Sequence, residues 1–227
     1  RIEADHPMGH TRRALRLGRA TARFLSRSFH ENLTNRKGRI EVIMGPMFAG
    51  KTSTLLRRVK EEEREGRSVL VVKSAKDKRY ATDAVVTHDG EKRGCAAVER
   101  LDHLPEDLLE DIDVVAVDES QFFSDLLETC VKIAESGKLV ITAGLDMDFR
   151  GKAFGETSEL ARVADTSTKL KAICTVCGDP ASYTTRLIKD PTQTVVGGAE
   201  IYAPVCSAHF ELTVEPDMDT IKDTVRD

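Results

Sequence analysis

The chain has 227 residues, of which 40% are hydrophobic and 32% charged, with a formal net charge of −4. These proportions are ordinary for a globular protein and exclude disorder throughout the chain. No stretch approaches the roughly 18 consecutive apolar residues of a membrane-spanning helix, so we expect a soluble protein.

The charge is distributed unevenly along the chain. Of the 34 basic and 38 acidic residues, ten and three lie in residues 1–39, which leaves 24 and 35 in residues 40–227. The body is therefore acidic and lacks the clustered Lys and Arg that give proteins nonspecific affinity for nucleic acid. We expect no nucleic-acid partner, whereas the acidic charge does not exclude small phosphorylated ligands.

The N-terminal segment is basic. Residues 8–29 contain no acidic residue and are rich in Arg, with Ser and Thr. This composition resembles an organelle transit peptide, but it also describes a disordered basic arm, which is the interpretation that we favour. We therefore assign residues 1–38 to a basic arm, disordered or targeting, and expect a cytoplasmic protein unless the arm directs it to an organelle.

From residue 39 onward, short apolar runs alternate with amphipathic stretches. The apolar runs predict four strands, at 39–45, 68–73, 113–119 and 138–146. The amphipathic stretches predict three helices, at 52–66, 103–111 and 124–137. Ser124 is the expected cap of the last helix, and Gly66 and Gly137 are expected to end the first and last. Val-rich strands that alternate with helices predict a parallel sheet covered on both faces.

The segment GPMFAGKT, from Gly45 to Thr52, matches the phosphate-loop pattern G-x-x-x-x-G-K-[ST]. It lies between a predicted strand and a predicted helix, as this motif requires. Its glycines permit a tight turn whose N–H groups, with the positive end of the helix, face phosphates. Lys51 can then reach the β- and γ-phosphates, and the Thr52 hydroxyl can join a Mg²⁺ shell. A turn that uses glycine for geometry alone is the weaker alternative.

An acidic pair, Asp118 and Glu119, follows four apolar residues at the end of the predicted strand 113–119. A phosphate-loop protein needs a carboxylate from a second strand end to hold magnesium, and Asp118 fits this role. An Asp that only caps the strand is the alternative. Acidic pairs in this place occur in kinases, helicases and ATPase motors, so the pair alone does not separate these classes.

Two short metal-binding motifs, CTVC at 174–177 and CSAH at 206–209, lie near the C-terminus. Their four ligands would complete a tetrahedral zinc site: Cys174, Cys177, Cys206 and His209. Two disulfides or free buried thiols are weaker alternatives, because nothing signals secretion. Four protein ligands leave no open position, so this zinc would be structural and would close a loop. Gly197 and Gly198 in that loop either bring the backbone close to a ligand or form a hairpin turn.

Taken together, the motifs resemble thymidine kinase of the human-cytosolic, zinc-containing type. The resemblance rests on GPMFAGKT, KDKRY, THDG, DESQFF, GLDMDFRGKAFG, YTTR, GGAEIY and the two cysteine motifs, in order from about residue 39 to residue 210. It implies a P-loop NTPase with a RecA-like parallel α/β sheet. We accordingly expect an ATP-binding domain at 39–170, a zinc-binding lasso domain at 171–212 that closes over the nucleoside, and a flexible tail at 213–227.

The resemblance also implies the reaction, in which the γ-phosphate of ATP passes to the 5′-hydroxyl of deoxythymidine, with deoxyuridine as a secondary substrate. Glu119 matches the family's catalytic base, and Arg79 matches its phosphate-contacting arginine. Asp77 matches an acid near magnesium, beside Thr52 and Asp118. The ATP-binding residues are those of the phosphate loop: Gly45, Pro46, Met47, Phe48, Ala49, Gly50, Lys51 and Thr52.

The nucleoside pocket follows from the same resemblance, with a lasso loop at 190–203 that holds the pyrimidine through main-chain hydrogen bonds. Its expected residues are Met47, Phe122, Leu145, Phe149, Phe154, Thr184, Val195, Gly197 and Tyr202. Without the family, the phenylalanines would more often be core residues, and we expect Phe123 to be one. The family further implies Mg²⁺ with ATP, structural Zn²⁺, a homotetramer, feedback inhibition by dTTP and a role in salvage.

Three positions depart from the family pattern. His209 stands where many members have a fourth cysteine, DMDF at 146–149 replaces D-G-T-F, and Ser120 replaces a common glycine. None of these changes removes a catalytic group. Two rival classes are a DExx ATPase motor, for whose second lobe 227 residues leave no room, and a zinc-dependent nucleic-acid module, which would need a basic face near the zinc ligands.

Overall fold

The computed structural model of the protein describes residues 37–76, 84–86 and 92–210. The predicted N-terminal arm, with the exception of its last two residues, and the predicted tail lie outside these ranges, as do Asp77 and Arg79. All of the described residues belong to one compact unit. None of the helices in these ranges has the length and apolar character that crossing a bilayer demands.

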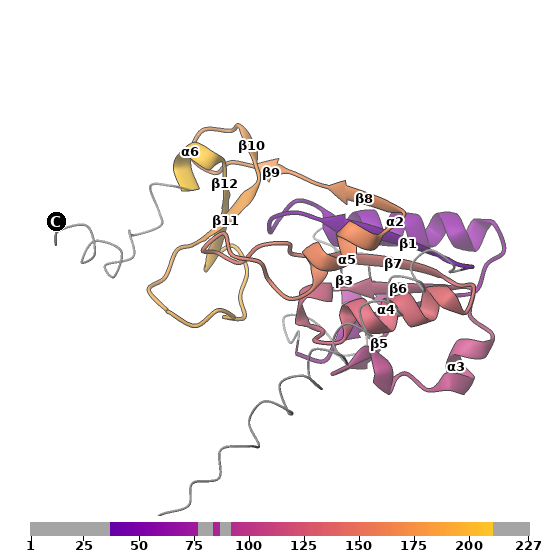
Figure 1. Cartoon of the computed structure of the whole chain (residues 1–227). Coiled ribbons are helices and arrows are strands. Elements are labelled where there is room, and N and C mark those ends of the chain that lie inside the picture. The colour runs from indigo at the N-terminus through magenta and orange to yellow at the C-terminus, as the bar shows by residue number, and fades with distance from the viewer. Residues whose placement is uncertain (1–36, 77–83, 87–91, 211–227) are drawn as a thin grey trace, which may run out of the picture. The chain divides into compact units, whose positions relative to one another are not determined.

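A sheet of six parallel strands forms the centre of the molecule (Figure 1). Its strand order is β5-β2-β6-β7-β1-β8, and every pairing is parallel. The strands are β1 Arg39–Met44, β2 Val69–Ser74, β5 Ala96–Val98, β6 Val114–Asp118, β7 Leu139–Gly144 and β8 Thr166–Lys169. The predicted parallel sheet and its four apolar strands are confirmed. The edge strands β5 and β8 were missed, because AAV and TSTK contain no long apolar run.

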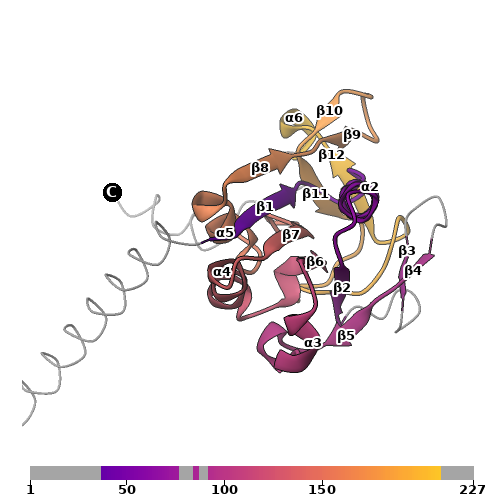
Figure 2. The same cartoon turned by 90° about the vertical axis from the view of Figure 1, so that its right-hand side faces the viewer.

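Helices cover both faces of the sheet. Figure 2 shows α2 (Lys51–Arg64) on one side, and α4 (Leu126–Glu135) and α5 (Thr157–Val163) on the other. Leu55, Leu56 and Val59 of α2 pack on alternate strand residues such as Val114 and Ala116. The intervening strand residues are also buried. Because both faces are covered, successive strand residues are all apolar, which explains the unbroken Val-rich runs.

Two of the predicted helices differ from the structure at their beginnings. The helix predicted at 103–111 is α3, Glu106–Glu110, and Pro105 is its N-cap, because proline is poorly tolerated inside a helix. A separate 3₁₀ turn precedes it at η1, Leu101–His103. The cap predicted at Ser124 is wrong, since α4 begins after Asp125. Asp125 is buried and accepts a hydrogen bond from the Asp102 amide, so a tertiary contact fixes this helix start.

The predicted glycine terminators lie where expected. Gly66 has φ 82° and Gly137 has φ 96°, both in the left-handed region that favours glycine. Their amides donate to Glu63 and Ala134, in the last turns of α2 and α4. The helix ends are therefore fixed by local chemistry that the sequence displays.

Smaller elements complete the fold. After β8, two antiparallel pairs follow the sheet, β9 with β10 and β11 with β12. A further antiparallel hairpin is formed by β3 and β4. The bounds are β3 Ala84–Val86, β4 Lys92–Gly94, β9 Ala172–Ile173, β10 Pro180–Ala181, β11 Tyr183–Arg186, β12 Tyr202–Val205, α6 Ser207–Phe210 and the 3₁₀ turn η2 Ser120–Phe122.

Candidate functional site

The phosphate loop joins the end of β1 to the start of α2. Gly45 has φ 146°, and a Cβ there would lie 2.5 Å from the Leu170 carbonyl oxygen, so no larger residue fits. Gly50 is the N-cap of α2 with φ 78°. Lys51 begins the helix, and its Nζ donates to the Pro46 carbonyl at 2.7 Å. The lysine therefore folds back over the loop whose amides are predicted to bind phosphate.

Asp118 is the last residue of β6 and only 6% exposed. The Thr52 hydroxyl lies 3.1 and 3.2 Å from its two carboxylate oxygens. Burial raises the pKa of Asp118 to about 7, the charge of Glu119 adds to this rise, and the Thr52 hydrogen bond opposes it. A hydroxyl and a carboxylate that converge in this way are the oxygen donors that Mg²⁺ prefers.

Glu119 has φ 52° and ψ 43°, a left-handed conformation that is strained in a residue other than glycine. Its carboxylate accepts a hydrogen bond of 2.6 Å from Gln121 Nε2, and Gln121 Oε1 accepts one of 2.9 Å from the Leu145 amide. Gln121 therefore links the acid to the end of β7 and fixes its orientation. Strained residues of this kind concentrate at functional sites, where surrounding structure holds them.

A single pocket contains both the predicted phosphate-binding residues and the predicted nucleoside-binding residues. Lys51, Thr52, Asp118 and Glu119 line it together with all nine predicted nucleoside-binding residues. Of the remaining phosphate-loop residues, Phe48 and Gly50 line it, whereas Gly45, Pro46 and Ala49 belong to the loop without lining this pocket. The roles assigned to these residues remain predictions.

The aromatic residues of the pocket come from separate elements. Phe122 and Phe154 pack edge to face, with ring centroids 5.7 Å apart. Phe123, by contrast, is 1% exposed and belongs to the core, as expected. The Met47 amide donates to Thr184 Oγ1 at 2.9 Å, so the phosphate loop directly contacts β11. This contact brings the segment after the sheet to the edge of the pocket.

Several residues that line the pocket were not predicted from the sequence, among them Gln121, Lys73, Asp148 and Gln193. Lys73 is 3% exposed and pairs in register with Asp118 across β2 and β6. A lysine at the end of an otherwise apolar strand was the available signal for Lys73. For Gln121 and Gln193 the sequence offers no comparable signal, because each contacts a residue far away in the chain, Leu145 and Asp148 respectively.

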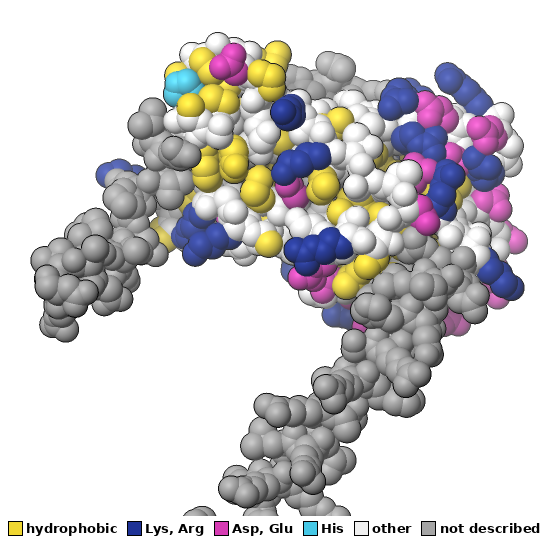
Figure 3. Space-filling view, turned by 45° about the horizontal axis from the view of Figure 1, so that its top comes forward, with side chains coloured by type: hydrophobic (Ala, Val, Ile, Leu, Met, Phe, Trp, Pro, Cys, Tyr) yellow, Lys and Arg dark blue, Asp and Glu magenta, His cyan; other side chains and the backbone are white. Residues whose placement is uncertain are grey.

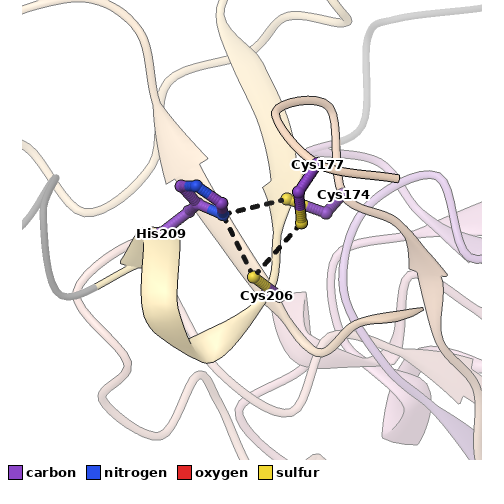
Figure 4. A group of neighbouring side chains, drawn as sticks. All are labelled: Cys174, Cys177, Cys206 and His209. Carbon is purple, nitrogen blue, oxygen red and sulfur yellow. Dashed lines mark hydrogen bonds between the residues drawn. The ribbon is translucent and has the colours of Figure 1, made fainter. Parts of the chain in front are cut away.

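The four predicted zinc ligands lie together (Figure 4). Their ligand atoms are all within 4.8 Å of one another. His209 Nδ1 is 3.2 Å from Cys206 Sγ and 3.7 Å from Cys174 Sγ, and Cys177 Sγ is 3.8 Å from Cys206 Sγ. Tetrahedral zinc, with Zn–S of about 2.3 Å and Zn–N of about 2.0 Å, separates neighbouring ligand atoms by roughly 3.5–3.8 Å. The cluster therefore fits zinc, and it does not fit a disulfide, whose S–S bond is about 2.05 Å.

The electrostatics of Cys174 suit a metal ligand. Burial raises the pKa of this thiol, but hydrogen bonds from the backbone at Cys177, Cys206 and Val176 together outweigh burial and hold the pKa at about 6. Because zinc binds the thiolate, backbone donors that stabilise this charge prepare the site for a cation.

The zinc cluster is tied to the phosphate loop by packing. Tyr183 and Phe210 stack with ring centroids 4.4 Å apart, and Ala49 of the phosphate loop packs against the same small core. Figure 3 shows hydrophobic side chains near the cyan histidine at this end of the molecule, where Ile173 and Val176 are exposed. The same view shows Lys and Arg interspersed with Asp and Glu among the described residues of this face.

The parallel sheet, the phosphate loop and the acidic pair at the end of β6 define a P-loop nucleotide-binding protein, with a Cys/His cluster that could hold zinc after its core. The family model described as thymidine kinase matches residues 38–210. Thymidine kinase a of Arabidopsis thaliana is 48% identical over 178 residues, 76% of this chain and 75% of the relative. The chain therefore belongs to the thymidine kinase family, and it is an enzyme.

Two further relatives carry the same name. Thymidine kinase of Oryza sativa subsp. japonica is 46% identical over 76% of this chain and 66% of the relative. Thymidine kinase of Bacteroides thetaiotaomicron is 43% identical over 78% of this chain and 89% of the relative. The similarity thus extends to relatives from both plants and bacteria.

Proposed function

We propose that the protein transfers the γ-phosphate of ATP to the 5′-hydroxyl of deoxythymidine, with deoxyuridine as a secondary substrate. The observation that carries this proposal is the pocket, which joins Lys51 and the acidic pair to an aromatic end bounded by the lasso loop. Such a pocket accommodates a phosphate donor at one end and a nucleoside at the other. Membership of the thymidine kinase family supports the choice of nucleoside.

In the proposed mechanism, the phosphate loop binds and orients the ATP phosphates. Lys51 leaves the Pro46 carbonyl to contact the β- and γ-phosphates, and the loop amides bind the phosphate oxygens. Thr52 and Asp118 are the residues that would hold Mg²⁺. The chemistry that Mg²⁺ supplies when bound is neutralisation of charge on the transferred group. Correct alignment and charge neutralisation provide most of the rate acceleration.

Glu119 is the proposed general base. Its carboxylate takes the proton from the 5′-hydroxyl as that oxygen forms a bond to the γ-phosphorus, and the bond from this phosphorus to the β,γ-bridging oxygen breaks to release ADP. Gln121 fixes the orientation of Glu119 through the 2.6 Å hydrogen bond. General-base assistance of this kind contributes about 10²–10⁴-fold to the rate.

The family resemblance also supports a proposal about regulation. The triphosphate dTTP is formed from the proposed product, dTMP, by further phosphorylation. It would place its nucleoside in the aromatic end of the pocket and its triphosphate along the phosphate loop. Because one pocket spans both ends, dTTP would compete with thymidine and with ATP. The enzyme would thus serve deoxynucleoside salvage and would be inhibited by dTTP, the end product of that pathway.

Phosphorylation of labelled thymidine tests the proposal. We expect dTMP to form only with both ATP and Mg²⁺, equally well with and without added polynucleotide. Lys51→Met should abolish product, whereas Lys60→Met, a matched lysine on the exposed side of the same helix, should retain it. Absence of dTMP together with polynucleotide-stimulated ATP hydrolysis would replace the kinase proposal by an ATPase motor.

A further inference from the structure

Arg186, the last residue of β11, organises the lasso loop. Its Nη1 donates to the carbonyl of Asp190 at 2.8 Å and to that of Thr192, and its Nη2 donates to the Gln193 carbonyl at 2.9 Å. Three carbonyls of the loop therefore converge on one guanidinium. The loop joins β11 to β12 without forming a strand of its own (Figure 1).

A second chain of hydrogen bonds extends this contact to the pocket. Arg186 Nη2 also donates to the Tyr202 hydroxyl at 2.9 Å, and that hydroxyl donates to the Val195 carbonyl at 2.8 Å. Val195 and Tyr202 both line the pocket. The guanidinium thus fixes the loop on both sides of its bend, at 190–193 directly and at Val195 through Tyr202.

The face of the guanidinium contacts the segment after β7. Arg186 Cζ lies 3.7 Å from the centroid of the Phe149 ring, a close cation–π contact. Gln193 Nε2 donates to Asp148 Oδ2 at 3.1 Å, and Arg150 donates to the Pro191 carbonyl. Asp148 and Arg150 therefore contact the loop directly, and Phe149 between them contacts Arg186.

Only an arginine can make this set of contacts. The guanidinium presents five donors in a rigid plane, so it can bind several carbonyls at its edge while its face stacks on a ring. Lysine keeps the charge but has a compact ammonium group and no planar face.

We propose that Arg186 is a positioning residue for the nucleoside, holding the lasso loop closed before the substrate binds. This inference rests on the proposed function, in which the loop borders the nucleoside. Apparent affinity falls in proportion to the fraction of molecules in the binding-competent conformation. If the loop is closed in only one molecule in about twenty, the KM for thymidine rises about twentyfold, whereas saturating thymidine restores the closed form and most of kcat.

The test compares Arg186→Lys and Arg186→Gln with Arg150→Lys. Arg150 is the matched control, because its guanidinium also lies over the Phe149 ring, at 4.8 Å, but binds a single loop carbonyl where Arg186 binds three. Neither arginine lines the pocket itself. For both Arg186 variants we expect the KM for thymidine to rise about 10–50-fold, with kcat and the KM for ATP changed less than about threefold. Arg150→Lys should change all three constants less than about threefold.

Two measurements separate positioning from a merely structural role. Bound zinc should be the same in all variants, and hydrogen exchange without substrate should speed up in peptides covering residues 188–198 but not in β1 or β7. Unchanged exchange and thymidine KM in both Arg186 variants would overturn the proposal, as would an equal loss of kcat and zinc. If Arg186→Gln does not fold, Arg186→Lys decides. If the parent protein makes no dTMP, the proposed function fails, and the exchange result still decides the role of Arg186.

Discussion

Replacement of Asp118 by asparagine should stabilise the protein while removing its activity. Burial, with the charge of Glu119, raises the pKa of Asp118 from 3.8 to about 7 in the magnesium-free protein. A buried carboxyl group with a raised pKa binds its proton more tightly in the folded chain than in the unfolded chain. Its ionisation therefore costs stability, which is lost progressively as the pH rises from the unfolded to the folded pKa.

The size of this effect follows from the two pKa values. The neutral amide in the Asp118→Asn variant does not ionise, so the free energy of unfolding should rise by roughly 2 kcal/mol at pH 5 and roughly 4 kcal/mol at pH 8. For a domain of this length, 4 kcal/mol corresponds to an increase of about 8–16 °C in the unfolding temperature. Activity should be lost, because the neutral amide is a poor ligand for Mg²⁺.

The assay is thermal unfolding without magnesium or nucleotide at pH 5 and pH 8. Asp113→Asn is a matched control of opposite sign, because hydrogen bonds from the backbone and side chain of Ser68 lower the pKa of Asp113. Its ionised form contributes stability above the unfolded pKa, lost as the pH falls, so this variant should be less stable at pH 8. Since parent and variants share the zinc cluster, any loss of zinc at pH 5 affects all of them. A gain for Asp118→Asn that is absent, or larger at pH 5 than at pH 8, would refute the reasoning.

The remaining predictions concern the base, the zinc site and the turn beside the base. Glu119→Gln should lower kcat by about 10²–10⁴-fold while ATP still binds, and unchanged turnover would exclude Glu119 as the base. Cys174→Ser should lose zinc, measured by atomic absorption, and should have a higher KM for thymidine. Cys95→Ser lies outside the cluster and should keep its zinc. A Cys174→Ser variant with its full content of zinc would contradict the proposed ligand set. Gly144→Ala should cost about 1–3 kcal/mol, because its methyl group would overlap the Ser120 hydroxyl; an unchanged unfolding temperature would show that the turn can move aside.

The sequence by itself determined the chemistry that depends on short spacings. The phosphate loop is contiguous, so Gly45, Gly50 and Lys51 are placed by a strand, a turn and a helix that adjoin in the chain. Asp118 and Glu119 are placed in the same way by the strand that precedes them. The zinc ligands occur as two close pairs, and their residue types restrict which metal they can bind.

Tertiary structure alone decided how these parts are oriented. Gln121 holds Glu119 because the end of β7 lies beside it, and Asp125 replaces Ser124 as a cap because η1 packs against it. Arg186 binds lasso carbonyls that follow it closely in the chain, but the Phe149 ring and the Tyr202 hydroxyl, which complete its contacts, come from other segments. A spacing along the chain specifies neighbours within a few residues, whereas these contacts depend on how strands and loops pack. For this protein, the sequence therefore predicts which groups react, and the packing of the chain decides what holds them in place.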